Sequence, residues 1–262
     1  MDAKPKGVTT PQRFPGRTRY IILGIISLAA VWQLMSMFLP EIVIASPADT
    51  FSALWQLLIT AELWRDLGIS LLRIIIGVLG GSLVGGVLGI LAGLNYRWQA
   101  FLEPIRWVVM TVPSIVILVI VLLLVGMGGT QVIIMTGIIT LPFTYVSTLE
   151  GMQAIDRRLI EMAQVYRIPR RLRMTSIYLP GIGAAVMAGL TLAAGIGVRA
   201  AILAEFMGAR DGVGHGLFLS WTHLNTPDLF GWILLTFGLL GLIEFGLLRP
   251  VRNTLLRWQN VV

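Results

Sequence analysis

The sequence predicts an all-α integral membrane protein with about six transmembrane helices. Hydrophobic residues make up 56% of its 262 residues and charged residues only 13%, and the mean hydropathy is +0.84. A soluble domain carries about twice that share of charge. Apolar runs of about 20 residues, each long enough to cross a bilayer as a helix, alternate with polar segments. Basic residues collect in some of these segments and not in others, which is typical of a fixed membrane orientation.

The N-terminal part is expected to contain a tail and the first span. Residues 1–19 are polar and basic, and we expect them to form a cytoplasmic tail. Residues 20–39 are almost entirely apolar and predict the first transmembrane helix. A cleavable signal peptide is the alternative interpretation, but the basic lead is long and no clear small-x-small cleavage site follows.

Residues 40–66 are expected to form an extracytoplasmic segment that includes an interfacial helix. Ser46 can cap this helix, Pro47 suits its first turn, and Asp49 interacts favourably with its positive end. Apolar residues then recur at helical spacing, which predicts either a helix lying on the interface or one packed against a neighbouring segment. They are Phe51, Leu54, Trp55 and Leu58.

Residues 67–248 are expected to form the membrane core, with a long charged loop at residues 150–180 between the fourth and fifth helices of the chain. The five spans of the core are expected at 69–94, 101–125, 130–149, 181–204 and 229–248. Thr111 and Ser114 flank Pro113 in the third span of the chain, where their hydroxyls could satisfy freed backbone groups or line a path. Residues 249–262 form a cytoplasmic tail.

A stripe of glycines marks the second span. Its members follow one another at i, i+4 spacing: Gly77, Gly81, Gly85, Gly89 and Gly93. Glycine weakens a helix, so a repeated glycine indicates that another backbone approaches closely. The stripe predicts tight packing against a second helix, and a sliding surface for conformational change is the alternative.

The distribution of the 20 Lys and Arg residues predicts the orientation. If the N-terminus is cytoplasmic, only Arg65, Arg73 and Arg210 lie on the outer side, and Arg199 lies within a span. All other basic residues fall on the inner side, as the positive-inside rule requires. Both termini and the charged loop are therefore expected in the cytoplasm.

The sequence offers no catalytic constellation. It contains no cysteine and only two histidines, which excludes thiol-ligated metal sites, disulfides and a histidine-rich metal site. Gly-x-Ser-x-Gly, Walker-type and His-Glu-x-x-His motifs are absent. The chain is therefore not expected to be an enzyme, and its clustered basic residues indicate membrane orientation rather than nucleic-acid binding.

Ionisable residues within or beside the spans are candidates for function, because burying them in lipid is costly. Arg73 and Glu205 lie near the outer ends of spans and could snorkel to water. Glu103 and Arg106, at i, i+3, are expected to pair. Arg199 lies deeper, where it could contact an anionic solute or pair with Glu205 or a carbonyl. The candidates are Arg73, Glu103, Arg199, Glu205 and Glu244, of which Arg199 and Glu205 are placed on a translocation path.

The charged loop has the pattern of two short helices. Asp156 can cap the first, which should end near Arg167 because the residue before Pro169 avoids the helical region. Residues 170–178 can form the second. A short helix presented beyond the membrane could dock in a groove of another protein, although an ordinary basic inner loop explains the charge equally well.

The loop resembles the cytoplasmic loop of ABC-importer permeases, whose motif reads Glu-Ala-Ala, three residues, Gly, nine residues and Ile-x-Leu-Pro. Five residues match at the right spacing: Glu161, Ala163, Ile177, Leu179 and Pro180. Met162 replaces an alanine and Arg167 replaces the glycine. Since that glycine suits a left-handed helix end, Pro169 is expected to provide the stop instead.

A wider likeness, from about residue 46 to residue 249, resembles the nitrate, sulfonate, taurine and bicarbonate branch of these permeases. It rests on residues 69–77, Leu102-Glu-Pro104, Val112-Pro-Ser114, residues 204–208 and Gly212-Val-Gly214. The resemblance implies a second permease copy, two cytoplasmic ATPase subunits that bind ATP and magnesium, and an extracytoplasmic solute-binding protein. It also implies a multi-pass protein of a prokaryotic cell membrane, with no cofactor of its own.

By the same resemblance, the loop residues that contact the ATPase would be Glu161, Met162, Ala163, Tyr166, Arg167, Ile168, Pro169, Ile177, Leu179 and Pro180. The expected function is the permease subunit of an importer for a small solute such as a sulfonate or nitrate. The alternative is a self-contained channel or secondary transporter, although the sequence lacks the internal repeat that is usual in such proteins.

Overall fold

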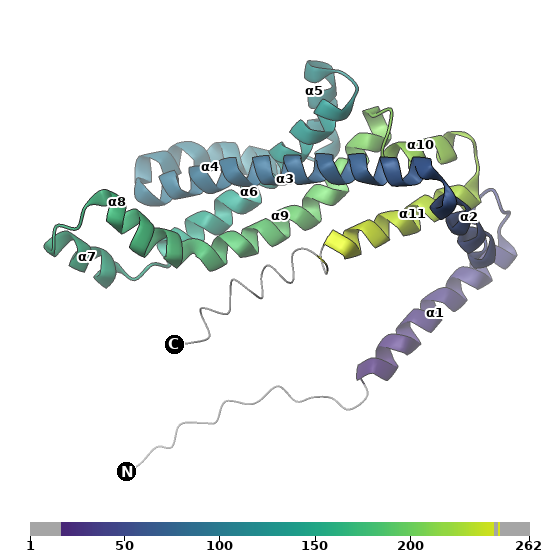
Figure 1. The fold of residues 1–262 in the computed structure, drawn as a ribbon, viewed down its shortest axis with the longest axis horizontal. Coiled ribbons are helices and arrows are strands. Elements are labelled where there is room, and N and C mark those ends of the chain that lie inside the picture. Colours follow the sequence, from purple (N-terminus) through teal and green to yellow (C-terminus); the bar gives the residue numbers. More distant parts are fainter. Residues whose placement is uncertain (1–16, 244–245, 247–262) are drawn as a thin grey trace, which may run out of the picture.

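The computed structural model describes residues 17–243 and 246, and these residues form helices without a β-strand (Figure 1). The predicted all-α class is therefore confirmed. The helices are α1 (Arg17–Phe38), α2 (Pro47–Ile59), α3 (Ala61–Leu94), α4 (Tyr96–Thr111), α5 (Ser114–Val125), α6 (Gly129–Gln153), α7 (Arg157–Val165), α8 (Arg170–Arg173), α9 (Leu179–Gly208), α10 (Val213–Thr222) and α11 (Thr226–Gly241). The tail predicted at 249–262 and most of that at 1–19 lie outside the described residues.

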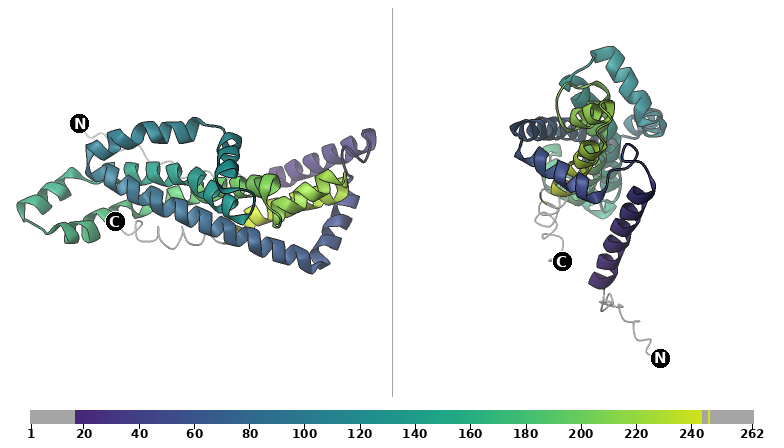
Figure 2. Two further views of the ribbon diagram at one scale, coloured as in Figure 1. Left: turned by 90° about the horizontal axis from the view of Figure 1, so that it is seen from above. Right: turned by 90° about the vertical axis from the view of Figure 1, so that its right-hand side faces the viewer.

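Helices α3, α6 and α9 lie side by side and form the core of the molecule (Figures 1 and 2). Their facing sides carry apolar residues such as Val78, Met135 and Val198, which are almost fully buried. The outer sides of the helices carry large exposed hydrophobic residues, for example Leu83 and Leu192. A bundle that is apolar both inside and outside is suited to a lipid environment.

The glycine stripe of α3 lies against α6. At each of its five positions a Cβ atom would meet atoms of α6 at less than 3 Å, and the stripe consists of Gly77, Gly81, Gly85, Gly89 and Gly93. A Cβ at Gly77 would lie 2.7 Å from Cβ of Thr136, and a Cβ at Gly81 would overlap the carbonyl oxygen of Gly137. The two backbones are therefore as close as glycine allows, which is the packing mode of small residues in membrane helices.

Among residues 17–243, four helical stretches are each long and apolar enough to cross a membrane. They are residues 19–38, 61–94, 129–153 and 170–208. The sixth predicted span, 229–248, begins in α11, an apolar helix of 16 residues, and its last part lies outside the described residues.

The third predicted span, 101–125, falls on two helices, α4 and α5, which together are long and apolar enough to form one bent span. The chain bends by 102° between α4 and α5, so α5 projects from the bundle in Figure 1. Pro113 follows Val112, which adopts an extended conformation with φ −67° and ψ 128°, as residues before proline prefer. The neighbouring Thr111 and Ser114 are exposed.

The N-terminal helices pack less closely. Most of α1 stands apart from the bundle (Figure 2), and its end is held where Trp32 stacks on Phe230 and donates a hydrogen bond of 3.0 Å to the carbonyl of Ala45. At the start of α2, the hydroxyl of Ser46 accepts a hydrogen bond of 3.2 Å from the amide of Asp49, so the predicted cap is confirmed.

Candidate functional site

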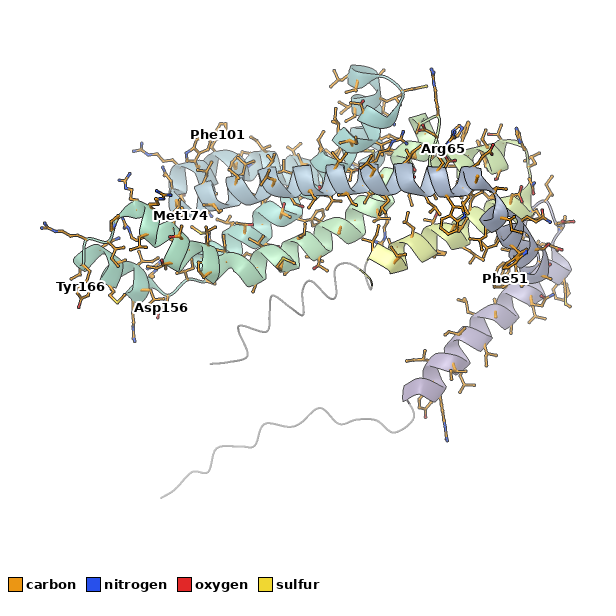
Figure 3. The ribbon with its side chains drawn as sticks, in the orientation of Figure 1. Phe51, Arg65, Phe101, Asp156, Tyr166 and Met174 are labelled. Atoms are coloured by element: carbon orange, nitrogen blue, oxygen red, sulfur yellow. The ribbon has the colours of Figure 1, made fainter. Side chains whose placement is uncertain are left out.

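Residues 154–178 form a helical hairpin, here called the α7–α8 hairpin, that projects from one end of the bundle (Figures 1 and 3). Asp156 caps α7, because its Oδ1 accepts a hydrogen bond of 2.9 Å from the amide of Arg158. In Figure 3, Asp156 and Tyr166 lie at one end of the molecule, and Arg65 and Phe51 lie at the other. The hairpin is therefore separated from the predicted outer segment by the length of the bundle.

The end of α7 is fixed by two backbone hydrogen bonds. The amide of Ile168 donates to the carbonyl of Ala163 at 2.9 Å, and the amide of Arg167 donates to the carbonyl of Gln164 at 3.0 Å. This is the Schellman arrangement, which requires a left-handed residue after the cap. Arg167 fills that position with φ 50°. The expectation that Pro169 would replace the glycine-type turn is therefore wrong, because Arg167 itself adopts the left-handed conformation.

One side of α7 presents apolar side chains to the exterior. Leu159, Met162 and Tyr166 recur at i, i+3 and i+7 and are 46%, 46% and 76% exposed. Ala163, between them, is fully buried. We call Leu159, Met162 and Tyr166 the apolar strip of α7. Exposed apolar residues at this spacing on a projecting helix are typical of a helix that docks in a groove.

The polar side of α7 carries Arg157, Arg158 and Glu161, all exposed. Within residues 17–243 and 246, none of these residues forms an ion pair; the recorded pairs lie on other helices. The charges of this side are thus available for contacts beyond the chain.

The second half of the hairpin continues into α9 without a break. The sequence predicted a separate helix over 170–178, but α8, a π-helical turn (Met174–Tyr178) and α9 form one helical stretch over residues 170–208. The amide of Leu179 donates to the carbonyl of Met174, and Pro180 follows in the first turn of α9. Ile177 is partly buried, while Leu179 and Pro180 are exposed.

At the opposite end, an ion-pair cluster joins α3 to the turn after α9. Arg73 lies 3.1 Å from Glu205 and 2.5 Å from Asp211, measured between guanidinium nitrogens and carboxylate oxygens. Glu205 is fully buried and also accepts hydrogen bonds from the hydroxyl of Ser70, at 2.7 Å, and from the amide of Gly214, at 3.1 Å. The expectation that Arg73 and Glu205 snorkel separately is wrong, because they satisfy each other.

Sequence reasoning missed Ser70 and Asp211 as members of this cluster. The available signal was weak: Ser70 and Arg73 are three residues apart on one face of a helix, and a buried arginine requires a carboxylate. The predicted pair of Glu103 and Arg106 is confirmed at the surface of α4, where two hydrogen bonds join the guanidinium to the carboxylate.

Arg199 does not pair with Glu205. It is exposed on α9 and lines a cavity of about 330 Å³ between α9, α10 and α11. The structure does not gather the four residues placed on the path: Glu205 is in the ion-pair cluster, and Thr111 and Ser114 lie at the bend before α5. Arg199 alone of these lines that cavity. Among the described residues, no group of three His, Asp or Glu side chains is placed to hold a metal ion.

Solved structures with this fold are transporter components. A chain of the inward-facing MetNI methionine ABC transporter aligns with a TM-score of 0.65 at 18% identity, covering 74% of this chain and 96% of its own length. A chain of a bacterial alginate ABC transporter, in complex with an alginate-pentasaccharide-bound periplasmic protein, aligns with a TM-score of 0.57 at 14% identity, covering 90% and 96%.

Sequence comparison finds relatives along most of the chain. A putative aliphatic sulfonates transport permease protein from Bacillus subtilis is 26% identical, covering 94% of this chain and 91% of its own. The protein of the same name from Escherichia coli is 29% identical, covering 89% of each, and the taurine transport system permease protein from Escherichia coli is 27% identical, covering 77% and 73%. Residues 85–248, more than half of the chain, match the family described as binding-protein-dependent transport system inner membrane component. The chain therefore belongs to this family and is the multi-pass permease subunit of an ABC importer rather than an enzyme.

Proposed function

We propose that this permease subunit forms the membrane path for a small oxyanion, such as a sulfonate or nitrate, and that separate ATPase subunits drive it through the α7–α8 hairpin. The substrate class is supported by relatives that match most of the chain, two of which are named as aliphatic sulfonate permeases and one as a taurine permease. The hairpin's role is supported by the apolar strip of α7.

The apolar strip is the observation that carries the proposal. A helix of nine residues that extends beyond the bundle gains nothing for folding by exposing Leu159, Met162 and Tyr166. Burying them in a groove of a partner would remove apolar area from water and stabilise the complex. The Schellman end and the cap by Asp156 hold the helix in shape before the partner binds, which lowers the entropic cost of docking.

The hairpin and both termini are proposed to be cytoplasmic. Six arginines lie in or beside the hairpin, and they are Arg157, Arg158, Arg167, Arg170, Arg171 and Arg173. Such a concentration at one end of a bundle favours the inner side of the membrane. The opposite end carries Arg65 and α2, with its exposed Phe51 and Trp55, which suits an outer interface.

The assembly proposed is a pair of permease copies, two cytoplasmic ATPase subunits and an extracytoplasmic solute-binding protein, in the cell membrane of a prokaryote and surrounded by lipid. ATP and magnesium would bind to the ATPase subunits, and this chain would hold no cofactor. We propose no nucleic-acid partner. The residues proposed to couple to the ATPase are Glu161, Met162, Ala163, Tyr166, Arg167, Ile168 and Pro169 of the hairpin, with Ile177, Leu179 and Pro180 at its base.

Continuity between the hairpin and α9 supplies the mechanical link. Because residues 170–208 are one helical stretch, a displacement of the hairpin moves the membrane part of α9 as well. ATP binding can change the path only if the ATPase contacts the hairpin differently in its two states. The ATPase would displace α7, and this displacement would be transmitted to the membrane as a shift of α9 against α3 and α6.

The test is a charge reversal on α7. Glu161→Lys should leave the protein inserted but reduce co-purification of the ATPase and ATP-dependent uptake in proteoliposomes. Glu150→Lys, the same change at an exposed position in α6, serves as the matched control. Retention of both ATPase binding and uptake in Glu161→Lys would contradict the proposal. Solute flux through the permease alone, without ATP, would instead favour a channel or secondary transporter.

A further inference from the structure

Arg199 lies within the span predicted at residues 181–204, toward its outer end. Its neighbour Gly197 packs against Val78, because a Cβ at Gly197 would lie 2.5 Å from a methyl group of Val78. Val78 is at the middle of α3, the 34-residue helix that spans the bundle. The backbone of Arg199 is five residues, about 7–8 Å along the helix, from the outer end of the predicted span at residue 204, so it lies inside the hydrocarbon region.

The side chain of Arg199 is exposed on the face of α9 that turns away from α3 and α6. It forms one wall of the 330 Å³ cavity, whose other lining is apolar except for the hydroxyl of Thr236. Facing lipid at this depth would be costly for an arginine, and intramembrane arginines normally face a protein interior or a water-filled cavity. The face of α9 that carries Arg199 is therefore one that water or protein covers.

Arg73 and Arg199 differ in their ionic partners. Arg73 has two carboxylates, Glu205 and Asp211, within 3.1 Å. Within the part of the chain that the structure describes, Arg199 has no carboxylate within 4.0 Å. A fixed positive charge that is kept in an apolar cavity attracts an anion, and the planar guanidinium offers paired donors that match two oxygens of a sulfonate, nitrate or carboxylate.

We propose that Arg199 is the anion-recognition residue of the translocation path, binding a small singly charged oxyanion within the outer half of the membrane. The proposal rests on the proposed function, because it assigns a substrate contact to that path. The guanidinium supplies charge-assisted hydrogen bonds to the oxyanion, and the apolar walls of the cavity accept its hydrocarbon part. The thirty-residue α9 that carries Arg199 is continuous with the hairpin, so the site moves when the hairpin moves.

The first experiment measures uptake of radiolabelled ethanesulfonate by the complete importer, with its ATPase subunits and binding protein, in proteoliposomes. Arg199→Gln should lower the uptake rate roughly tenfold to a hundredfold, as expected for the loss of a charged hydrogen-bond donor, while ATP hydrolysis stays within about twofold. Arg199→Lys should retain a large part of the uptake. Arg65→Gln, at an exposed outer arginine, is the control and should remain within about twofold of the wild type.

A second measurement does not depend on transport. The chain has no native cysteine, so Arg199→Cys introduces a single reporter. Labelling of this cysteine by a membrane-impermeant thiol reagent, slowed by ethanesulfonate, supports the assignment. Leu28→Cys, exposed on the isolated α1, should resist labelling. A cysteine at position 199 that no aqueous reagent reaches would overturn the proposal.

The remaining outcomes are also decisive. Glu244 lies outside the described residues and is the acidic residue nearest in sequence to Leu240 of the cavity, so it is the alternative partner to test. If Arg199→Gln loses uptake and the double variant Arg199→Gln, Glu244→Gln regains it, Arg199 is half of a structural ion pair and the proposal is wrong. If Arg199→Gln transports ethanesulfonate like the wild type, the proposal is again wrong, while the proposed importer function stands. If the wild type transports no sulfonate or nitrate, the proposed substrate is wrong, and labelling at position 199 still decides whether this residue faces the aqueous path.

Discussion

The amide of Ile168 donates a hydrogen bond of 2.9 Å to the carbonyl of Ala163, and this bond closes α7 across a left-handed Arg167. The loop motif of ABC-importer permeases, which this loop resembles, has glycine at the position of Arg167. The structure shows why glycine suits that position: the backbone at φ 50° is strained for a residue with a Cβ atom. In this chain Arg167 adopts the left-handed backbone conformation in spite of the strain.

Arg167→Gly should therefore stabilise the end of α7 locally by about 1 kcal/mol relative to Arg167→Ala, because both variants remove the charge but only glycine removes the left-handed penalty. Hydrogen exchange of the backbone amides at positions 167 and 168 checks this, with a protection factor roughly fivefold higher in the glycine variant. Equal exchange in the two variants would show that the positive φ carries no strain.

The close contact of α3 with α6 predicts the effect of a single methyl group. In Gly81→Ala the new Cβ would overlap the carbonyl oxygen of Gly137 and the hydroxyl of Thr140, so the helices must separate. We expect a loss of about 1–3 kcal/mol in the free energy of unfolding, measured in mixed micelles. Gly80→Ala is the matched control: no atom lies within 4 Å of its Cβ, so the variant should be unchanged or slightly more stable. Similar losses in both would point to helix propensity rather than contact.

Much of the fold could be predicted from the sequence because lipid imposes simple requirements on it. Apolar runs predicted the spanning helices α1, α3, α6 and α9, and the glycine stripe marked the face of α3 that meets α6. The bend between α4 and α5 was not predicted, although Pro113 was noted. Proline can kink a helix slightly or end it, and hydropathy does not distinguish these outcomes, since both halves of the run remain apolar.

Only the parts of the candidate site that depend on residues close in sequence could be predicted. The hairpin is local in sequence, so its cap at Asp156 and its spacing could be inferred from neighbouring residues. The cluster of Arg73 with Glu205 joins residues 132 positions apart, and their pairing depends on how α9 packs against α3. Each residue alone was compatible with snorkelling to water. The left-handed Arg167 could not be inferred either, because arginine gives no signal for a positive φ.

The buried ion-pair cluster should be far more important for stability than the exposed pair on α4. Arg73→Gln leaves the fully buried Glu205 without its cation, and we expect a loss of roughly 3–5 kcal/mol in the free energy of unfolding. Adding Glu205→Gln should recover part of this loss. Arg106→Gln removes the partner of the half-exposed Glu103 and should cost at most about 1 kcal/mol. A double variant as unstable as the sum of its single variants would show that Arg73 and Glu205 are not energetically coupled.

The apolar strip of α7 should be necessary for ATPase binding but not for folding. Met162→Ser and Tyr166→Ser each remove an exposed apolar side chain, so the stability of the isolated permease should change by less than about 0.5 kcal/mol. If these side chains fill a groove of the ATPase, each variant should weaken the complex roughly tenfold or more, measured by titration of the purified ATPase onto the permease in nanodiscs. Gln164→Ser, also exposed on α7 but outside the strip, is the control and should bind normally. Unchanged affinity in both strip variants would show that the ATPase contacts another surface, and the coupling role of α7 would have to be abandoned.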